Sequence, residues 1–192
     1  MVSLVSGLIL FFAVHLLPTA PSLRTALRAR LGENGYKLAF SLASALGLGL
    51  IVVGVSAMRG AAADVQLWYP PIWARHLAFT LMLPAFVLVV AAYTPSHIRD
   101  WARHPMLAGV TLWAAAHLAA NGDLLALLLF GSFLLFSLYD RISASRREVP
   151  PRPAARGWAA DGAAVLVGVG LWAATLLWLH AWAGVPLLAF AR

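Results

Sequence analysis

The sequence contains no cysteine, which excludes disulfide bonds, thiolate metal sites and the covalent attachment of c-type haem. Charged residues make up only 11% of its 192 residues, and only seven are acidic. We expect all seven to lie in connections between apolar segments, and no two have the spacing of a catalytic carboxylate pair. A P-loop, a glycine-rich dinucleotide motif, an HExxH motif and an internal repeat are also missing. The acidic residues are Glu33, Asp64, Asp100, Asp123, Asp140, Glu148 and Asp161.

Apolar sequence, by contrast, is abundant: 62% of the residues are hydrophobic, and the mean hydropathy is +0.83. Runs of roughly membrane length predict an all-α, polytopic membrane helical bundle with about six transmembrane helices. Because no stretch is left for a separate soluble domain, we expect residues 1–192 to form a single membrane domain. The predicted spans are residues 2–17, 36–58, 72–93, 105–120, 122–139 and 162–184.

The predicted connections differ in character. Asn121-Gly122-Asp123 is so short that it predicts an antiparallel helical hairpin, with Asp123 capping the second helix. Residues 19–35 predict an interfacial helix that carries three arginines and ends near Gly32 and Gly35. Residues 140–161 are basic and rich in proline, so we expect a mobile cytoplasmic loop. The first span has no preceding positive charge, and we interpret it as a retained helix and not a signal peptide.

Basic residues predict the orientation of the chain, because loops on the cytoplasmic side are enriched in lysine and arginine. Eleven basic residues fall in loops predicted to be inside and three outside, so both termini should lie outside. The net charge of +7 then reflects contact with anionic lipids and not a nucleic-acid partner. The inside set is Arg24, Arg28, Arg30, Lys37, Arg99, Arg103, Arg141, Arg146, Arg147, Arg152 and Arg156; the outside set is Arg59, Arg75 and Arg192.

Histidine is the residue type most able to ligate a metal or carry a proton here, and three of the six histidines lie inside apolar runs. For His15 and His117, a metal ligand and a buried structural histidine are both open interpretations. We interpret His180, near the outer end of the last span, as structural. His76 is expected at the outer interface, and His97 in a loop.

Two motifs on the fourth predicted span carry further chemistry. Pro105 suits a first helical turn, and the helix N-terminus behind it favours anions. Arg103 and His104 therefore either recognise a carboxylate, phosphate or haem propionate, or anchor the helix at the membrane surface.

The second motif consists of Trp113, His117 and Asn121, which recur every four residues and so share one stripe of a helix. With alanines at 114–116, this stripe suits a flat ligand or an axial metal bond. The alternative is a histidine hydrogen-bonded to the backbone of a neighbouring helix.

These blocks resemble the NnrU family of bacterial membrane proteins over at least residues 7–140. The resemblance rests on AVHLLPTAPSLR (13–24), GENGY (32–36), RHPMLAGVTLWAAAHLAANGD (103–123) and FG (130–131). It implies a multi-pass protein of the bacterial inner membrane that acts in nitrogen-oxide (denitrification) metabolism. The same domain forms the plastid 15-cis-zeta-carotene isomerase, which implies haem b and redox or isomerase-like chemistry, with a small apolar or nitrogen-oxide ligand.

The resemblance to the isomerase also implies that His15 and His117 are the axial metal ligands. Arg24 or Arg103 would pair with haem propionates, Trp113 would wall the pocket, and His104 and Asn121 would complete the cofactor-binding set. A cysteine proposed as an alternative ligand in the isomerase corresponds to Ala114, so a thiolate switch cannot operate here. Judged by depth in the membrane, His76 is an alternative partner for His117.

Two other functions are compatible with the sequence. The Arg103-His104-Pro105 motif before an apolar helix is similar to that of isoprenylcysteine-type methyltransferases that use S-adenosylmethionine, although no partner motif follows residue 140. The other function is that of a non-enzymatic accessory protein for a nitrite or nitric oxide reductase system, which would bind no cofactor. The substrate, the electron donor and the oligomeric state are left open.

Overall fold

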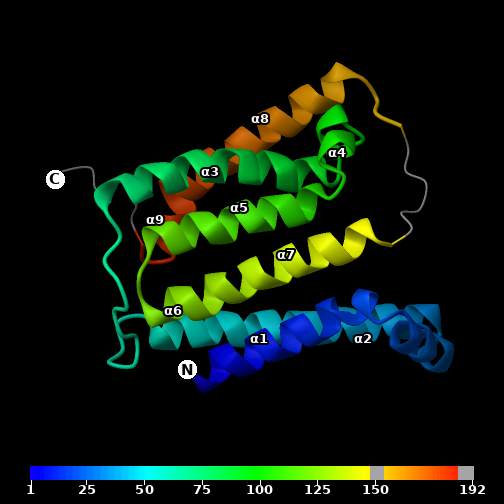
Figure 1. Cartoon of the computed structure of the whole chain (residues 1–192), viewed down its shortest axis with the longest axis horizontal. Coiled ribbons are helices and arrows are strands. Elements are labelled where there is room, and N and C mark those ends of the chain that lie inside the picture. Colours follow the sequence, from blue (N-terminus) through cyan, green and yellow to red (C-terminus); the bar gives the residue numbers. More distant parts are fainter. Residues whose placement is uncertain (148–153, 186–192) are drawn as a thin grey trace. The chain divides into compact units, whose positions relative to one another are not determined.

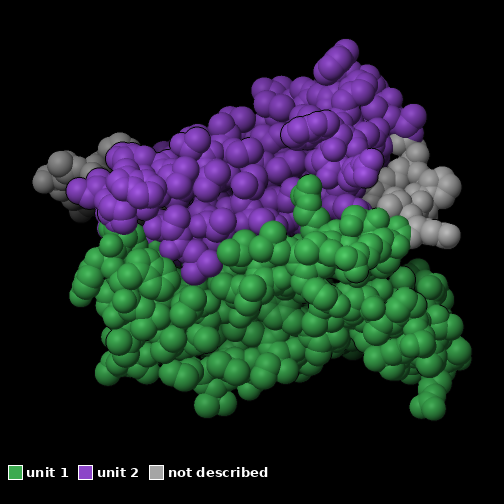
Figure 2. Space-filling model, viewed as in Figure 1, with its two compact units in different colours: residues 1–70, 121–147 green, residues 71–120, 148–192 purple. Residues whose placement is uncertain are grey.

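A computed structural model describes residues 1–147 and 154–185, and these residues are organised almost entirely as helices (Figure 1). The all-α fold class is therefore confirmed. The chain divides into two compact units (Figure 2), one of residues 1–70 and 121–147, the other of residues 71–120 and 148–192. Arg152, Arg192 and the middle of the predicted 140–161 loop lie outside the described residues.

The first unit is built on an antiparallel pair of helices, α1 (Val2–His15) and α2 (Pro21–Met58). Glycines let the two backbones approach closely: a β-carbon on Gly7 would lie 2.6 Å from the Ile51 nitrogen, and one on Gly47 would lie 2.9 Å from the Phe11 nitrogen. The short connection between the helices includes a 3₁₀ turn, η1 (Leu17–Thr19). The core of this unit consists of Leu4, Leu8, Ile51, Met58 and Leu125.

Helix α2 is interrupted at Gly32, where the backbone has φ 69° and ψ 168°. A positive φ costs little for glycine, so the helix that begins at Pro21 breaks here, where its end was predicted. The chain resumes a helix directly after Gly32, and Gly35 lies inside it. Arg28, before the break, and Lys37, after it, both pair with Glu33.

The third helical stretch of this unit joins α6 (Leu124–Ala126), a π-helical turn η2 (Leu127–Gly131) and α7 (Ser132–Ser145). The side chain of Asp123 accepts a hydrogen bond from the Ala126 nitrogen at 2.6 Å, which confirms the predicted cap. The preceding Gly122 is hydrogen-bonded to the segment after α2. Its carbonyl oxygen accepts hydrogen bonds from the backbone nitrogens of Leu67 (2.7 Å) and Trp68 (3.0 Å). Helix α5, on the other side of this turn, belongs to the second unit.

The second unit contains α3 (Ile72–Ala91), the short α4 (His97–Ala102), α5 (Pro105–Ala120) and α8 (Trp158–Ala174). Helix α8 continues through a π-helical turn, η3 (Thr175–Leu179), into α9 (His180–Trp182). Helix α3 packs against both α5 and α8, and a glycine makes each contact close. A β-carbon on Gly109 of α5 would lie 2.9 Å from the Ala85 carbonyl oxygen, and one on Gly168 of α8 would lie 2.7 Å from the Val87 α-carbon.

Among the residues that the structure describes, four helices are long and apolar enough to cross a membrane: Pro21–Met58, Ile72–Ala91, Leu124–Ser145 and Trp158–Trp182. Helices α1 and α5 are apolar but shorter, so four of the six predicted spans are supported. Large apolar side chains on the outer surfaces, such as Leu135 (72% exposed) and Leu166 (75% exposed), are consistent with contact to lipid.

Four of the acidic residues expected in connections between apolar segments are nevertheless helical. Glu33, Asp100, Asp140 and Asp161 are inside helices α2, α4, α7 and α8. The reason is that these helices either extend past their apolar segments or, for α4, form within a polar one.

Candidate functional site

His15 is the last residue of α1 and lies among aromatic rings of the first unit. Its imidazole stacks on Phe11, with ring centroids 3.9 Å apart and planes at 21°, and it also lies near Phe40 (5.2 Å) and Phe136 (6.2 Å). These rings come from α1, α2 and α7, so three helices meet around this half-buried histidine. Arg24, the predicted propionate partner, is exposed on the part of α2 before Gly32.

His117 lies near the end of α5 in the second unit, beside two other ring side chains. Trp113, one turn earlier, has its ring centroid 5.4 Å from that of His117, with planes at 51°. His180, the first residue of α9, has its ring centroid 6.2 Å away, with the two imidazole planes nearly parallel at 12°. His180 was interpreted as structural, and the sequence gives no signal that would pair it with a residue 63 positions earlier.

All three histidines of the apolar segments use Nδ1 in the same way. His15 contacts the Phe11 carbonyl oxygen at 2.7 Å, His117 that of Trp113 at 2.8 Å, and His180 that of Thr175 at 3.1 Å. A carbonyl oxygen can only accept, so Nδ1 must carry the proton in each ring. In a neutral imidazole the lone pair is then on Nε2. Each ring therefore has its unprotonated Nε2 on the side away from the carbonyl that Nδ1 contacts.

The start of α5 borders a hollow of about 390 Å³ that lies wholly within the second unit. It is lined by the buried Arg99 and half-buried His104, with Ala92, Pro105, Met106 and Leu107. Arg103 is exposed and has a positive φ of 58°, an uncommon conformation for a residue with a side chain. The arginine that lines the hollow is Arg99.

His117 is thirteen positions after His104, which corresponds to about 20 Å along a helix. The two histidines are therefore at opposite ends of α5. This length argues against a single haem that is bound by His117 while its propionates reach His104.

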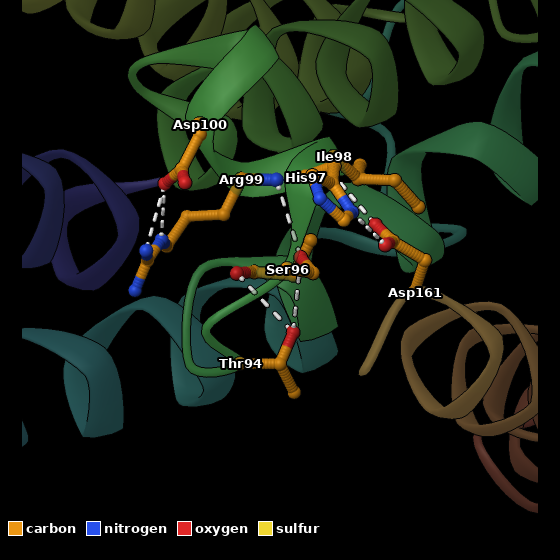
Figure 3. Close-up of polar contacts among 8 residues, drawn as sticks. Thr94, Ser96, His97, Ile98, Arg99, Asp100 and Asp161 are labelled. Atoms are coloured by element: carbon orange, nitrogen blue, oxygen red, sulfur yellow. Dashed lines mark hydrogen bonds and ion pairs between the residues drawn. The ribbon is translucent and has the colours of Figure 1, made fainter. Parts of the chain in front are cut away.

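A polar cluster that the sequence reading missed joins α4 to α8 (Figure 3). The carboxylate of Asp161 contacts His97 Nδ1 at 2.6 Å and accepts from the Ile98 nitrogen at 2.9 Å. Ser96 caps α4 by accepting from the Arg99 nitrogen, and the Arg99 guanidinium pairs with Asp100. The serine cap could be predicted from the local sequence. The contact between His97 and Asp161 could not, because the two residues are 64 positions apart.

The NnrU family model, described as NnrU protein, matches residues 3–187, nearly the whole chain. The chain belongs to the NnrU family. No curated protein and no solved structure matches it. The resemblance inferred from residues 7–140 thus extends to almost the full length of the sequence.

In this NnrU protein, the predicted site residues fall in both units. Trp113, His117, Arg103 and His104 belong to the second unit, while His15, Arg24 and Asn121 belong to the first. Over residues 1–147 and 154–185, no group of three or more histidine, cysteine, aspartate or glutamate side chains is arranged to hold a metal ion. The residues that meet within one unit at close range are Trp113, His117 and His180.

Proposed function

We propose that this NnrU protein binds haem b within the membrane and uses His117 as one axial ligand. The observation that carries the proposal is the shared hydrogen-bonding pattern of the histidines in apolar helices. A histidine that ligates a metal usually donates its other ring N–H to a carbonyl or carboxylate, which fixes the ring and makes the ligating nitrogen more basic. The Nδ1 of His117 donates to the Trp113 carbonyl in this manner.

The available donors suit haem better than a bare metal ion. A bare ion bound by protein side chains usually needs three or four ligands, and the described residues contain no such cluster. A porphyrin brings four nitrogens of its own, so one or two histidines from the protein are sufficient. With cysteine absent from the sequence, histidine is the strongest axial ligand that this chain can offer.

The surroundings of His117 also suit a flat, apolar cofactor. Ala114 and Ala116 are fully buried, so α5 packs closely on that side, and Trp113 provides an aromatic wall next to the imidazole. When bound, haem would supply an iron that cycles between two oxidation states. Two histidine ligands favour electron transfer, whereas one open position favours chemistry on a small apolar or nitrogen-oxide ligand.

The proposal includes a setting for this chemistry: a bacterial inner membrane, crossed six times, with both chain termini outside. It is supported by the family, by the apolar helices and by the eleven basic residues in the loops predicted to be cytoplasmic. In this setting we infer redox or isomerase-like chemistry, or a role in nitrogen-oxide metabolism.

The test is the visible spectrum of detergent-purified protein expressed with a haem precursor, with pyridine haemochrome quantitation. We expect near-stoichiometric haem b with sharp reduced α and β bands, and at least tenfold less haem in His117→Ala. The matched control is His76→Ala, because His76 is exposed near the start of α3. A wild-type protein that stays colourless after titration with haemin would end the proposal, and loss of haem in His76→Ala would point to the alternative pairing.

A further inference from the structure

We infer that a hollow in the first unit binds a phosphate group, and that this phosphate belongs to the headgroup of an anionic membrane lipid. The hollow measures about 220 Å³ and lies where η1 and the start of α2 meet the end of α7. All of its lining residues belong to the first unit, so it is separate from the hollow at the start of α5. The inference does not depend on haem.

The lining of this hollow supplies hydrogen-bond donors that suit an anion. Arg146 and Arg147 directly follow α7, and Tyr139 and Ser143 add two hydroxyl groups. Arg147 is paired with Asp140 at 2.5 Å, but Arg146 is exposed and forms no ion pair within the described part of the chain. A guanidinium group binds phosphate through charge-assisted hydrogen bonds. Arg146 is therefore the main candidate to hold the phosphate.

The surrounding charge also favours an anion. The chain segments that contain the lining residues, 18–37 and 139–147, have only two acidic side chains, and both are paired with basic ones. Glu33 pairs with Arg28 and Lys37, and Asp140 pairs with Arg147. A surplus of positive charge remains, which attracts anionic headgroups. The basic residues of the two segments are Arg24, Arg28, Arg30, Lys37, Arg141, Arg146 and Arg147.

The outer face of α7 indicates a lipid as the source of the phosphate. Leu135, Tyr139 and Ile142 are exposed and recur at intervals of four and three, so they share one face of the helix. Arg146 follows Ile142 by one turn on the same face. From Leu135 to Arg146 this face extends about 17 Å, close to the hydrocarbon thickness of one leaflet, about 15 Å. A phospholipid has the same order, with apolar chains that end in a phosphate.

The position of the hollow along the helix agrees with this assignment. The stretch Leu124–Ser145 is long and apolar enough to cross a membrane, and the hollow lies at its end. Headgroups lie directly outside the hydrocarbon region, and tyrosine is enriched at that level. The basic loops predict that this end faces the cytoplasm, where the leaflet is rich in anionic lipids.

The experiment counts the lipid that detergent-purified protein retains in native mass spectrometry during titration with phosphatidylglycerol. We expect one tightly held molecule per chain, and none with diacylglycerol of the same acyl chains, which lacks the phosphate. Arg146→Gln should weaken phosphatidylglycerol binding about tenfold, because a charge-assisted hydrogen bond is lost. The matched control is Arg141→Gln. Arg141 is also exposed and belongs to α7, but it does not line the hollow, so this variant should stay within about twofold of the wild type.

Other outcomes would overturn the inference. Equal losses in the two arginine variants would show a diffuse attraction of charge and no site at the hollow. Equally tight binding of diacylglycerol would show that the phosphate is not recognised. Displacement of the lipid by millimolar inorganic phosphate, in the wild type but not in Arg146→Gln, would identify free phosphate as the ligand and overturn the lipid assignment. The haem content of both arginine variants should equal that of the wild type, so this inference and the proposed function can fail separately.

Discussion

A buried polar side chain in an apolar helix is costly unless its polar atoms are satisfied. In this protein the cost is reduced locally, because His15, His117 and His180 each donate Nδ1 to a carbonyl of their own helical segment. This bond is also the reason that its own helix can orient such a histidine before any ligand binds.

At the residue scale, Asp161 is expected to contribute more to stability than an exposed acid does. It is 8% exposed and holds α4 to α8 through His97 and the Ile98 nitrogen. In Asp161→Asn, the amide can keep only one of these two contacts as an acceptor, and its NH₂ group faces the other donor. We expect a lower melting temperature in detergent, measured by the loss of monodisperse protein on heating.

The control for this prediction is Glu33→Gln. Glu33 also pairs with two basic residues, Arg28 and Lys37, but all three side chains are exposed, and exposed ion pairs contribute little. If both variants melt at the same temperature as the wild type, the contact between α4 and α8 does not stabilise the fold as argued here.

At the element scale, helix contacts depend on which glycines face a neighbour. Gly168 and Gly170 are two residues apart on α8, but only Gly168 is within reach of another helix, at Val87 of α3. We expect Gly168→Ala to destabilise the protein by about 1–3 kcal/mol, because the obstacle is backbone. Gly170→Ala, with nothing within 4 Å of its β-carbon, should be neutral or stabilising by up to about 1 kcal/mol. Thermal unfolding of both variants in the same detergent measures this, and equal shifts would contradict the packing.

Some of the helices could be predicted from the sequence and others could not. The predicted span 105–120 coincides with α5, 72–93 nearly coincides with α3, and the Asp123 cap is confirmed, because apolar length, proline and capping residues act locally. The π-helical turn before His180 and the approach of His180 to His117 have no such signal. They follow from packing between segments far apart in the chain, which one sequence does not reveal.

At the scale of the whole molecule, the main question is how many helices cross the membrane. Six spans were predicted, while four helices in the described part of the chain have the length that a crossing needs. Helices α1 and α5 have 14 and 16 residues, so they would cross only a locally thinned bilayer or with help from flanking residues. Whether these two helices cross the membrane decides on which side of it the loops lie.

The absence of cysteine makes this question accessible to experiment, because any cysteine introduced is unique. Ala62 and Ala154 are both exposed and lie in different connections. Three predicted spans separate them if α5 crosses, which puts them on opposite sides of the membrane; only two separate them if α5 does not. We expect a membrane-impermeant maleimide to label Ala62→Cys in intact spheroplasts and Ala154→Cys only after lysis. Labelling of both before lysis would show that α5 does not cross, and labelling of Ala154→Cys alone would reverse the orientation inferred from the basic residues.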